Sequence, residues 1–107
     1  MLDVGGGTGT AAFLASHAMG RESTVVVVDS SFGMLRIARR KGLAVVADTV
    51  PGGPFPDGMF DRVMANFVLS YVACNRTALS DMVRVLRPGG WLGLTTWGTD
   101  HSECRKL

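Results

Sequence analysis

Residues 2–10 read LDVGGGTGT, and this stretch decides the fold of the 107-residue chain. Residues 1–4, which are mostly apolar, predict a short first strand, and the glycines within 5–9 predict a tight turn. Apolar residues then recur at helical spacing through 10–19, and Gly20 is typical of the residue that follows a helix. The turn thus precedes a helix N-terminus, where a bound group can approach free N–H groups closely.

The rest of the chain alternates short apolar runs with amphipathic stretches, which is typical of a parallel α/β sheet. The further predicted strands are 24–28, 43–47, 60–65 and 91–95. Two further helices are predicted, one capped by Ser30 or Ser31 and running to about Lys41, and one over 75–86. The predicted inward residues of the first helix are Ala11, Leu14, Ala15, Ala18 and Met19, and those of the last are Ala78, Leu79, Met82, Val83 and Leu86.

This order of elements predicts one α/β domain over residues 1–107, a Rossmann-like three-layer sandwich around a mostly parallel five-stranded sheet. Right-handed crossovers give the strand order 3-2-1-4-5. The switch point of the topology then lies beside the first strand. Open α/β sheets bind ligands there, at the C-terminal ends of the strands.

The composition sets limits on the partners of the chain. Eleven Lys and Arg against nine Asp and Glu give a net charge of +2, too small a bias to argue for nucleic acid or an anionic membrane. The basic run 39–41 ends a predicted helix, where it interacts favourably with the helix dipole. Cys74 and Cys104 have no metal or redox spacing, and no apolar stretch is long enough to cross a bilayer. We expect a cytoplasmic protein without metal, nucleic-acid or membrane partners.

The spacing of the glycines narrows the type of cofactor. A dinucleotide fingerprint needs Gly-x-Gly-x-x-Gly, and its last position falls here on Thr10. The observed pattern is Gly5-x-Gly7-x-Gly9, with Asp3 two residues ahead. No Gly-Lys-Ser/Thr follows, which excludes a P-loop. The pattern resembles motif I of the class I S-adenosylmethionine-dependent methyltransferases.

The resemblance to this family continues along nearly the whole chain. The stretch VDSS at 28–31 is similar to its second motif, in which an acid ends the second strand. The stretches 47–49 and 54–61 resemble its third region, and RVLRPGG at 84–90 resembles its last helix-to-strand turn. The chain is identified as a member of this family, with a type 11-like domain. The resemblance implies S-adenosylmethionine as cofactor and methyl transfer to a small molecule as function.

The resemblance also implies roles for individual residues. Asp29 would accept both ribose hydroxyls, or else only cap a helix. Asp48 would accept from the adenine amino group, with Thr49 beside it, or else only form a turn. Asp3 would attract the ammonium group of the methionine part, or only brace the loop. The full set of predicted cofactor contacts is Asp3, Gly5, Gly6, Gly7, Gly9, Asp29, Ser30, Met34, Asp48, Thr49 and Asn66.

No catalytic residue is predicted. Many relatives carry a histidine where this chain has Ser70-Tyr71, so no general base can be named. Methyl transfer needs little covalent help, because the protein contributes mainly by positioning the reacting groups. Two other functions stay open: a non-catalytic remnant that binds the cofactor or packs against a partner, and, disfavoured by the glycine spacing, a nicotinamide-dinucleotide-binding domain.

The chain looks incomplete beside the family. Relatives have an N-terminal segment that covers the cofactor and two further strands that complete the sheet. We therefore expect the chain alone to be a poor methyltransferase. An open edge at the last predicted strand, 91–95, would favour self-association.

Overall fold

The computed structural model describes residues 1–20, 22–48, 54–66 and 75–95, and its strands form one sheet in the order β3-β2-β1-β4-β5. All four pairings are parallel. The strands are β1 (Leu2–Val4), β2 (Val26–Asp29), β3 (Ala44–Ala47), β4 (Phe60–Asn66) and β5 (Leu86–Thr95), and the helices are α1 (Thr10–Met19), α2 (Phe32–Arg40) and α3 (Asn75–Val85). The predicted fold class and strand order are therefore confirmed.

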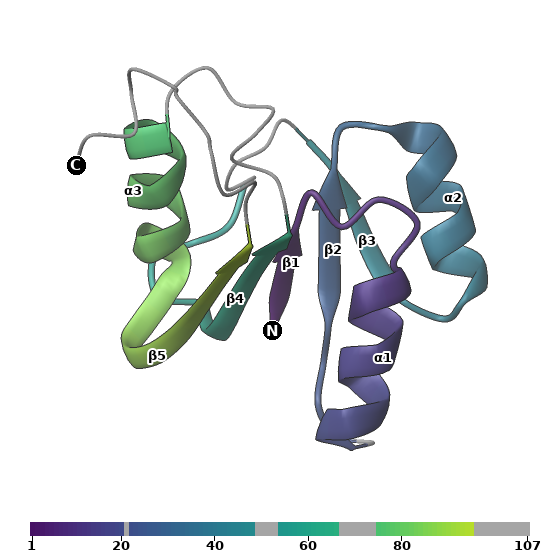
Figure 1. Cartoon of the computed structure of the whole chain (residues 1–107), viewed down its shortest axis with the longest axis horizontal. Coiled ribbons are helices and arrows are strands. Elements are labelled where there is room, and N and C mark those ends of the chain that lie inside the picture. Colours follow the sequence, from purple (N-terminus) through teal and green to yellow (C-terminus); the bar gives the residue numbers. More distant parts are fainter. Residues whose placement is uncertain (21, 49–53, 67–74, 96–107) are drawn as a thin grey trace.

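The helices cover the two faces of the sheet unequally, with α1 and α2 on one face and α3 on the other (Figure 1). The alternation of side chains along each strand creates two cores. Val27 of β2 packs with Leu35 and Ala38 of α2 and Ala12 of α1. Its neighbour Val28 belongs to the cluster on the α3 face.

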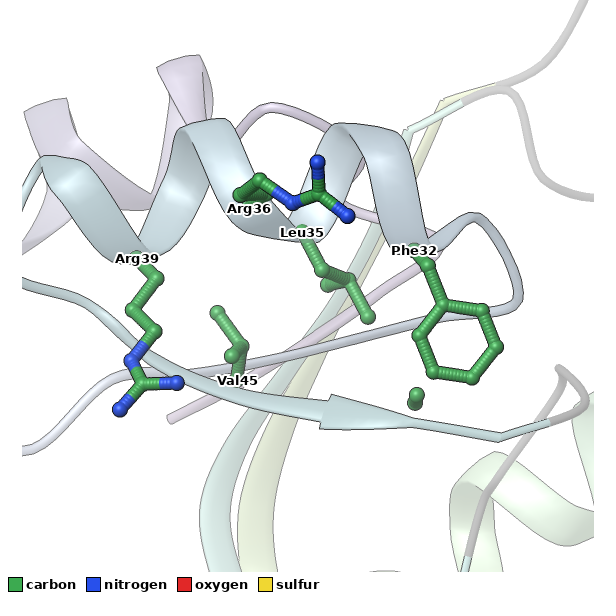
Figure 2. A pocket seen from close by; sticks show the side chains of 6 residues that line it. Phe32, Leu35, Arg36, Arg39 and Val45 are labelled. Carbon is green, nitrogen blue, oxygen red and sulfur yellow. The ribbon is translucent and has the colours of Figure 1, made fainter.

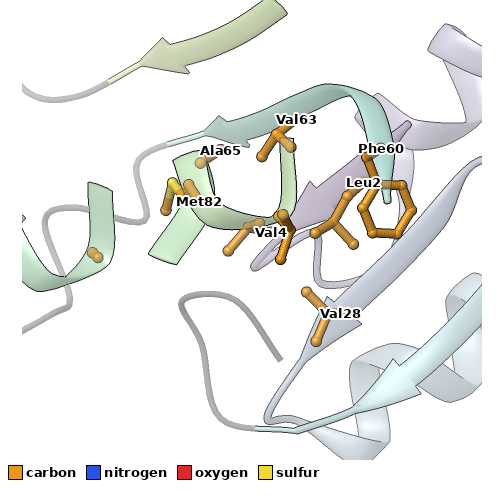
Figure 3. Close-up of a cluster of buried hydrophobic side chains, with 9 residues drawn as sticks. Leu2, Val4, Val28, Phe60, Val63, Ala65 and Met82 are labelled. Carbon is orange, nitrogen blue, oxygen red and sulfur yellow. The ribbon is translucent and has the colours of Figure 1, made fainter. Parts of the chain in front are cut away.

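The cluster on the α3 face is the larger core, and Figure 3 shows Leu2 and Val4 of β1 among the side chains of Val28, Val63 and Met82. Leu2, Val4 and Met82 have no exposed surface, and Val63 has 1%. Full burial of one such side chain stabilises a fold by roughly 1.5–3 kcal/mol. This core fixes the central strand, and with it the glycine turn that follows.

The predicted inward face of α1 is wrong in part. Leu14 is 65% exposed and Ala18 is exposed, whereas Ala12 is buried. The helix has apolar residues on nearly every side, so its periodicity does not define one buried face. Just before α1, Gly9 packs closely on α2, because an added Cβ would lie 3.1 Å from the Cβ of Ala38.

The junction of α3 and β5 also differs from the prediction, because the helix ends at Val85 and the strand begins at Leu86. Val85 is buried in place of Val83, which is 55% exposed. The ladder with β4 is irregular at its start and becomes regular where Trp91 pairs with Arg62. At Gly90 an added Cβ would lie 2.7 Å from the Asp61 carbonyl oxygen, so the turn can pack this tightly only with glycine.

Arg84 of α3 anchors the segment that leads into β4. Its Nη1 donates to the carbonyl oxygen of Phe55 at 2.7 Å and pairs with Asp57 at 2.9 Å. Its Nε pairs with Asp81 at 2.8 Å, and the carbonyl oxygen of Arg84 accepts from Gly58 N at 2.8 Å.

None of the helices in the described ranges is both long and apolar enough to cross a membrane.

Candidate cofactor site

The glycine turn lies at the C-terminal end of β1, where the strand order changes direction (Figure 1). Gly5, Gly7 and Gly9 have φ of 67°, 58° and 80°, which side chains other than glycine rarely adopt. Gly5 N donates to the Val28 carbonyl oxygen at 2.8 Å, and Gly9 N to that of Gly6 at 2.9 Å. The turn is therefore held by its own backbone and by β2.

Asp29, the last residue of β2, joins the glycine turn to the start of α2. Its Oδ2 accepts from Gly7 N and its Oδ1 accepts from Ser31 N, both at 2.9 Å. The N-cap of α2 is Ser31, whose Oγ accepts from Met34 N at 3.3 Å. An ionised carboxylate has about four acceptor positions, so Asp29 retains acceptor capacity for further donors.

Asp3 lies under the turn as a buried carboxyl group. It is 1% exposed, and neither Oδ atom has a hydrogen-bond donor within the described residues. Burial, and to a smaller degree the charge of Asp29, raises the pKa of Asp3 to about 7. Gly6 lies directly on it, since an added Cβ would be 2.6 Å from Asp3 Oδ2. A buried carboxylate without a donor is expensive, so this site is suited to a positive group.

The remaining predicted contacts lie around this centre. Asp48 N donates to the Asp29 carbonyl oxygen at 3.1 Å, which puts the exposed Asp48 beside the end of β2. Met34 is 48% exposed and faces the turn, because a Cβ on Gly7 would lie 3.2 Å from its Sδ. Ser30 is exposed between β2 and α2.

Asn66 ends β4 at the same edge of the sheet. Its Oδ1 accepts from Thr95 Oγ1 at 2.9 Å, at the end of β5. The sequence did not predict that Thr95 lies beside Asn66, nor the hydrogen bond that Ser31 N donates to Asp29. The signal for Thr95 was its position at the end of the last predicted strand, which the predicted order places beside the strand that Asn66 follows.

Two glycines of the turn have a packing role in the chain itself. A Cβ on Gly6 would also lie 2.8 Å from Val27 Cγ1, and one on Gly9 would lie 2.5 Å from Leu43 Cδ1. A Cβ on Gly7 would meet only Met34 and, at 4.0 Å, Asp29 Oδ2. Of these three positions, Gly7 alone would meet no atom closer than 3.0 Å, and its nearest neighbour, Met34 Sδ at 3.2 Å, is on a partly exposed side chain of the site.

Two other titratable residues lie away from this site. His17 is exposed on α1, and Asp61 pairs with Arg87 at 3.9 Å near the start of β4, away from the strand's C-terminal end. In the described part of the chain, no group of three His, Cys, Asp or Glu side chains could hold a metal ion. Predictions on Thr49, Ser70, Tyr71, Cys74 and Cys104 lie outside the described residues.

The family described as the methyltransferase domain matches residues 2–94. The chain belongs to this family, the class I S-adenosylmethionine-dependent methyltransferases. S-adenosylmethionine is the family's cofactor, and the site fits it. The ligand carries an ammonium and a sulfonium charge, and two carboxyl groups lie at the turn: Asp29, and Asp3, which has no hydrogen-bond donor among the described residues.

Known relatives share the fold and cover more chain. The ubiquinone/menaquinone biosynthesis C-methyltransferase UbiE of Shewanella frigidimarina is 34% identical over all of this chain and 46% of its own. A methyltransferase structure from Mesorhizobium loti has a TM-score of 0.78 at 27% identity, covering 89% of this chain and 45% of its own. The [4+2]-cyclase SpnF has a TM-score of 0.77 at 30% identity, covering 89% and 37%. The chain thus spans less than half the length of each.

Proposed function

We propose that this chain binds S-adenosylmethionine at the glycine turn, and that the protein transfers the methyl group to a small-molecule acceptor. The observation that carries the proposal is the Asp29 carboxylate, which two backbone N–H groups fix at 2.9 Å between the turn and α2. A carboxylate held there meets a ribose with its orientation already set. Less ordering is then needed on binding.

We assign the parts of the cofactor to the residues around that carboxylate. Asp29 accepts from the ribose hydroxyls, with Ser30 and Met34 beside the ribose and adenine. Asp48, with Thr49, accepts from the adenine amino group.

The backbone of Gly5 and Gly7 lies against the methionine part, and Gly6 and Gly9 give the turn its shape. Asn66 borders the methyl group, and Asp3 attracts the ammonium group from beneath the turn.

The bound cofactor supplies an activated methyl group on a sulfonium sulfur. The residues of the chain bind it, orient it and exclude water from one side. Positioning of this kind can supply much of the rate enhancement in a displacement reaction. We assign no general base, so the proposal favours acceptors that lose a proton readily.

We propose an acceptor of the quinone or hydroquinone class. The proposal is supported by the UbiE relatives, whose names specify C-methylation in ubiquinone and menaquinone biosynthesis. A panel that pairs a hydroquinone with a catechol and an aryl amine, assayed with methyl-labelled S-adenosylmethionine, tests it. Label on a ring carbon of the hydroquinone supports the class, and label only on oxygen or nitrogen contradicts it.

A second candidate is cofactor binding without methyl transfer. It is favoured by the similarity to SpnF, a protein described as a cyclase. The two candidates predict the same affinity for S-adenosylhomocysteine and differ in turnover. Binding without transfer to any member of the acceptor panel would support the second.

Self-association through β5 and a cytoplasmic location remain proposals. β5 ends the order of described strands, and Trp91 on it is 75% exposed. An open edge with an exposed aromatic side chain favours pairing with another chain. Light scattering of the wild-type chain and of Trp91→Lys tests this, and identical monomer masses for both would reject it. Cell fractionation tests the location.

The binding proposal is tested by calorimetry of the 107-residue chain with S-adenosylhomocysteine and, separately, NAD. We expect binding of the first and none of the second at the same concentrations. Binding of NAD without binding of S-adenosylhomocysteine would contradict the proposal and favour a nicotinamide-dinucleotide-binding function.

A further inference from the structure

The open edge of β3 borders a groove that the cofactor site does not use. The groove has a volume of about 300 Å³ and lies between α2 and β3 (Figure 2). Leu35, Val45 and Ala47 form its apolar part, with the ring of Phe32 at one end. Phe32 is 72% exposed, so a large apolar side chain stands beside the edge of β3 that no described strand pairs with.

The backbone of β3 offers hydrogen bonds along this groove. Asp48 N donates to Asp29 on β2, and backbone groups alternate sides along a strand. The groups of Val46 therefore also face β2, while those of Val45 and Ala47 face the open edge. The same two residues direct their side chains into the groove. A strand added at this edge would thus gain backbone hydrogen bonds and a side-chain pocket together.

The charged side chains that line the groove, Arg36 and Arg39, are both basic, and the exposed Asp48 lies just beyond Ala47 at one end of β3. Residues 30–47 contain Arg36, Arg39, Arg40 and Lys41 and no acidic residue, although the whole chain carries only +2. Arg36 and Arg39 line the groove, and neither forms an ion pair with a described residue. The weak net charge of the chain therefore hides a local concentration of positive charge on α2.

From this combination we infer that the β3 edge is a docking site for an extended acidic segment of a partner protein, which adds to the sheet as a further strand. On the side facing α2, its apolar side chains pack against Phe32 and Val45. Its carboxylates pair with Arg36 and Arg39. Recognition of this kind draws affinity from backbone hydrogen bonds and specificity from alternate side chains.

A second copy of the chain is the poorer occupant. Pairing two β3 edges would bring the four cations of one run against the four of the other. Juxtaposed like charges disfavour a complex. An acidic partner removes that repulsion and uses the same guanidinium groups.

The probe is the acetylated peptide Thr-Val-Thr-Glu-Thr-Val-Thr-Glu, with a control in which lysine replaces both glutamates. Both peptides carry the same C-terminal fluorophore, and binding to the 107-residue chain is measured by fluorescence anisotropy. We expect the glutamate peptide to bind and the lysine peptide not to bind. The double variant Arg36→Gln with Arg39→Gln should weaken binding by about tenfold, whereas Arg40→Gln, on the same helix but outside the groove, should change it less than about twofold.

Amide hydrogen exchange locates the peptide independently of any variant. The bound peptide should slow exchange at Val45 and Ala47 and leave Val46, already paired with β2, unchanged. No binding at millimolar peptide would overturn the inference and leave the arginines as charges that keep the edge unpaired. Equal loss in Arg40→Gln, binding of the lysine peptide, or protection elsewhere would also overturn it. Binding of S-adenosylhomocysteine, measured in the same samples, reports separately on the proposed function.

Discussion

Replacing Asp3 by asparagine should stabilise the chain at neutral pH while weakening cofactor binding. The carboxyl is 1% exposed and has no donor among the described residues, and its pKa is raised from 3.8 to about 7. The folded chain therefore holds a proton on Asp3 between about pH 4 and 7 that the unfolded chain releases. Stability accordingly falls as the pH rises through this window, and the penalty is complete above pH 7.

The size of the effect follows from the shift. A rise from 3.8 to about 7, at about 1.4 kcal/mol per pH unit, gives a penalty of about 4 kcal/mol at pH 8. Asparagine is neutral at every pH and similar in shape. We expect Asp3→Asn to match the wild type near pH 4 and to exceed it by up to about 4 kcal/mol at pH 8.

Urea denaturation at several pH values between 4 and 8 measures this difference. Asp61→Asn is the control, because that acid is 43% exposed and lies near the other end of the sheet. Its removal should change stability by less than about 1 kcal/mol across the range. If Asp3→Asn is no more stable than the wild type at pH 8, Asp3 has a donor or a counter-charge that the reasoning omits.

Three further substitutions test the site and the sheet. Asp29→Ala should weaken S-adenosylhomocysteine binding by about 10- to 100-fold, measured by calorimetry, whereas the control Asp61→Asn should leave the affinity unchanged. If Asp29→Ala binds with the same affinity as the wild type, the assignment of Asp29 to the ribose is wrong. Gly7→Val should abolish binding in a chain that circular dichroism shows to be folded. The φ of 58° at Gly7 also predicts a loss of stability of at least about 1–2 kcal/mol for the valine variant. Normal binding by the folded variant would contradict the placement of the cofactor against Gly7. Gly90→Ala should lower the free energy of unfolding by about 1–3 kcal/mol, because the added Cβ meets Asp61 and Leu86. Gly93→Ala is the control: its Cβ meets nothing within 4 Å, so its free energy of unfolding should differ from the wild type by less than about 0.5 kcal/mol. Similar effects of the two substitutions would show that the packing at Gly90 is looser than described.

The sheet order could be predicted because local signals agreed with one topology. The glycine turn fixed where the first strand ends, and the β-branched run before Asp29 indicated a strand buried on both faces. The handedness of crossovers then left few arrangements. The inward face of α1 could not be predicted in the same way, since Ala12 and Leu14 are both apolar and the helix has apolar residues on nearly every side.

The identity of the site residues was more predictable than their interactions. The acid at the end of β2 was a sequence signal, but its bonds to Gly7 and Ser31 depend on how close the turn comes to α2. Nothing in the sequence states that Asp3 lacks a donor, because burial depends on how the turn folds over it. The charge of the β3 edge was likewise hidden in the net charge until α2 and β3 were placed side by side.

The most direct test of a cofactor site at the glycine turn is amide chemical-shift mapping of the isotope-labelled chain with S-adenosylhomocysteine. The account predicts that the largest shifts fall on Gly5, Gly7, Asp29 and Ser31, with Gly58, on the loop before β4, unaffected. Saturable binding whose shifts fall instead on the β3 edge, or no shifts at millimolar ligand, would contradict it.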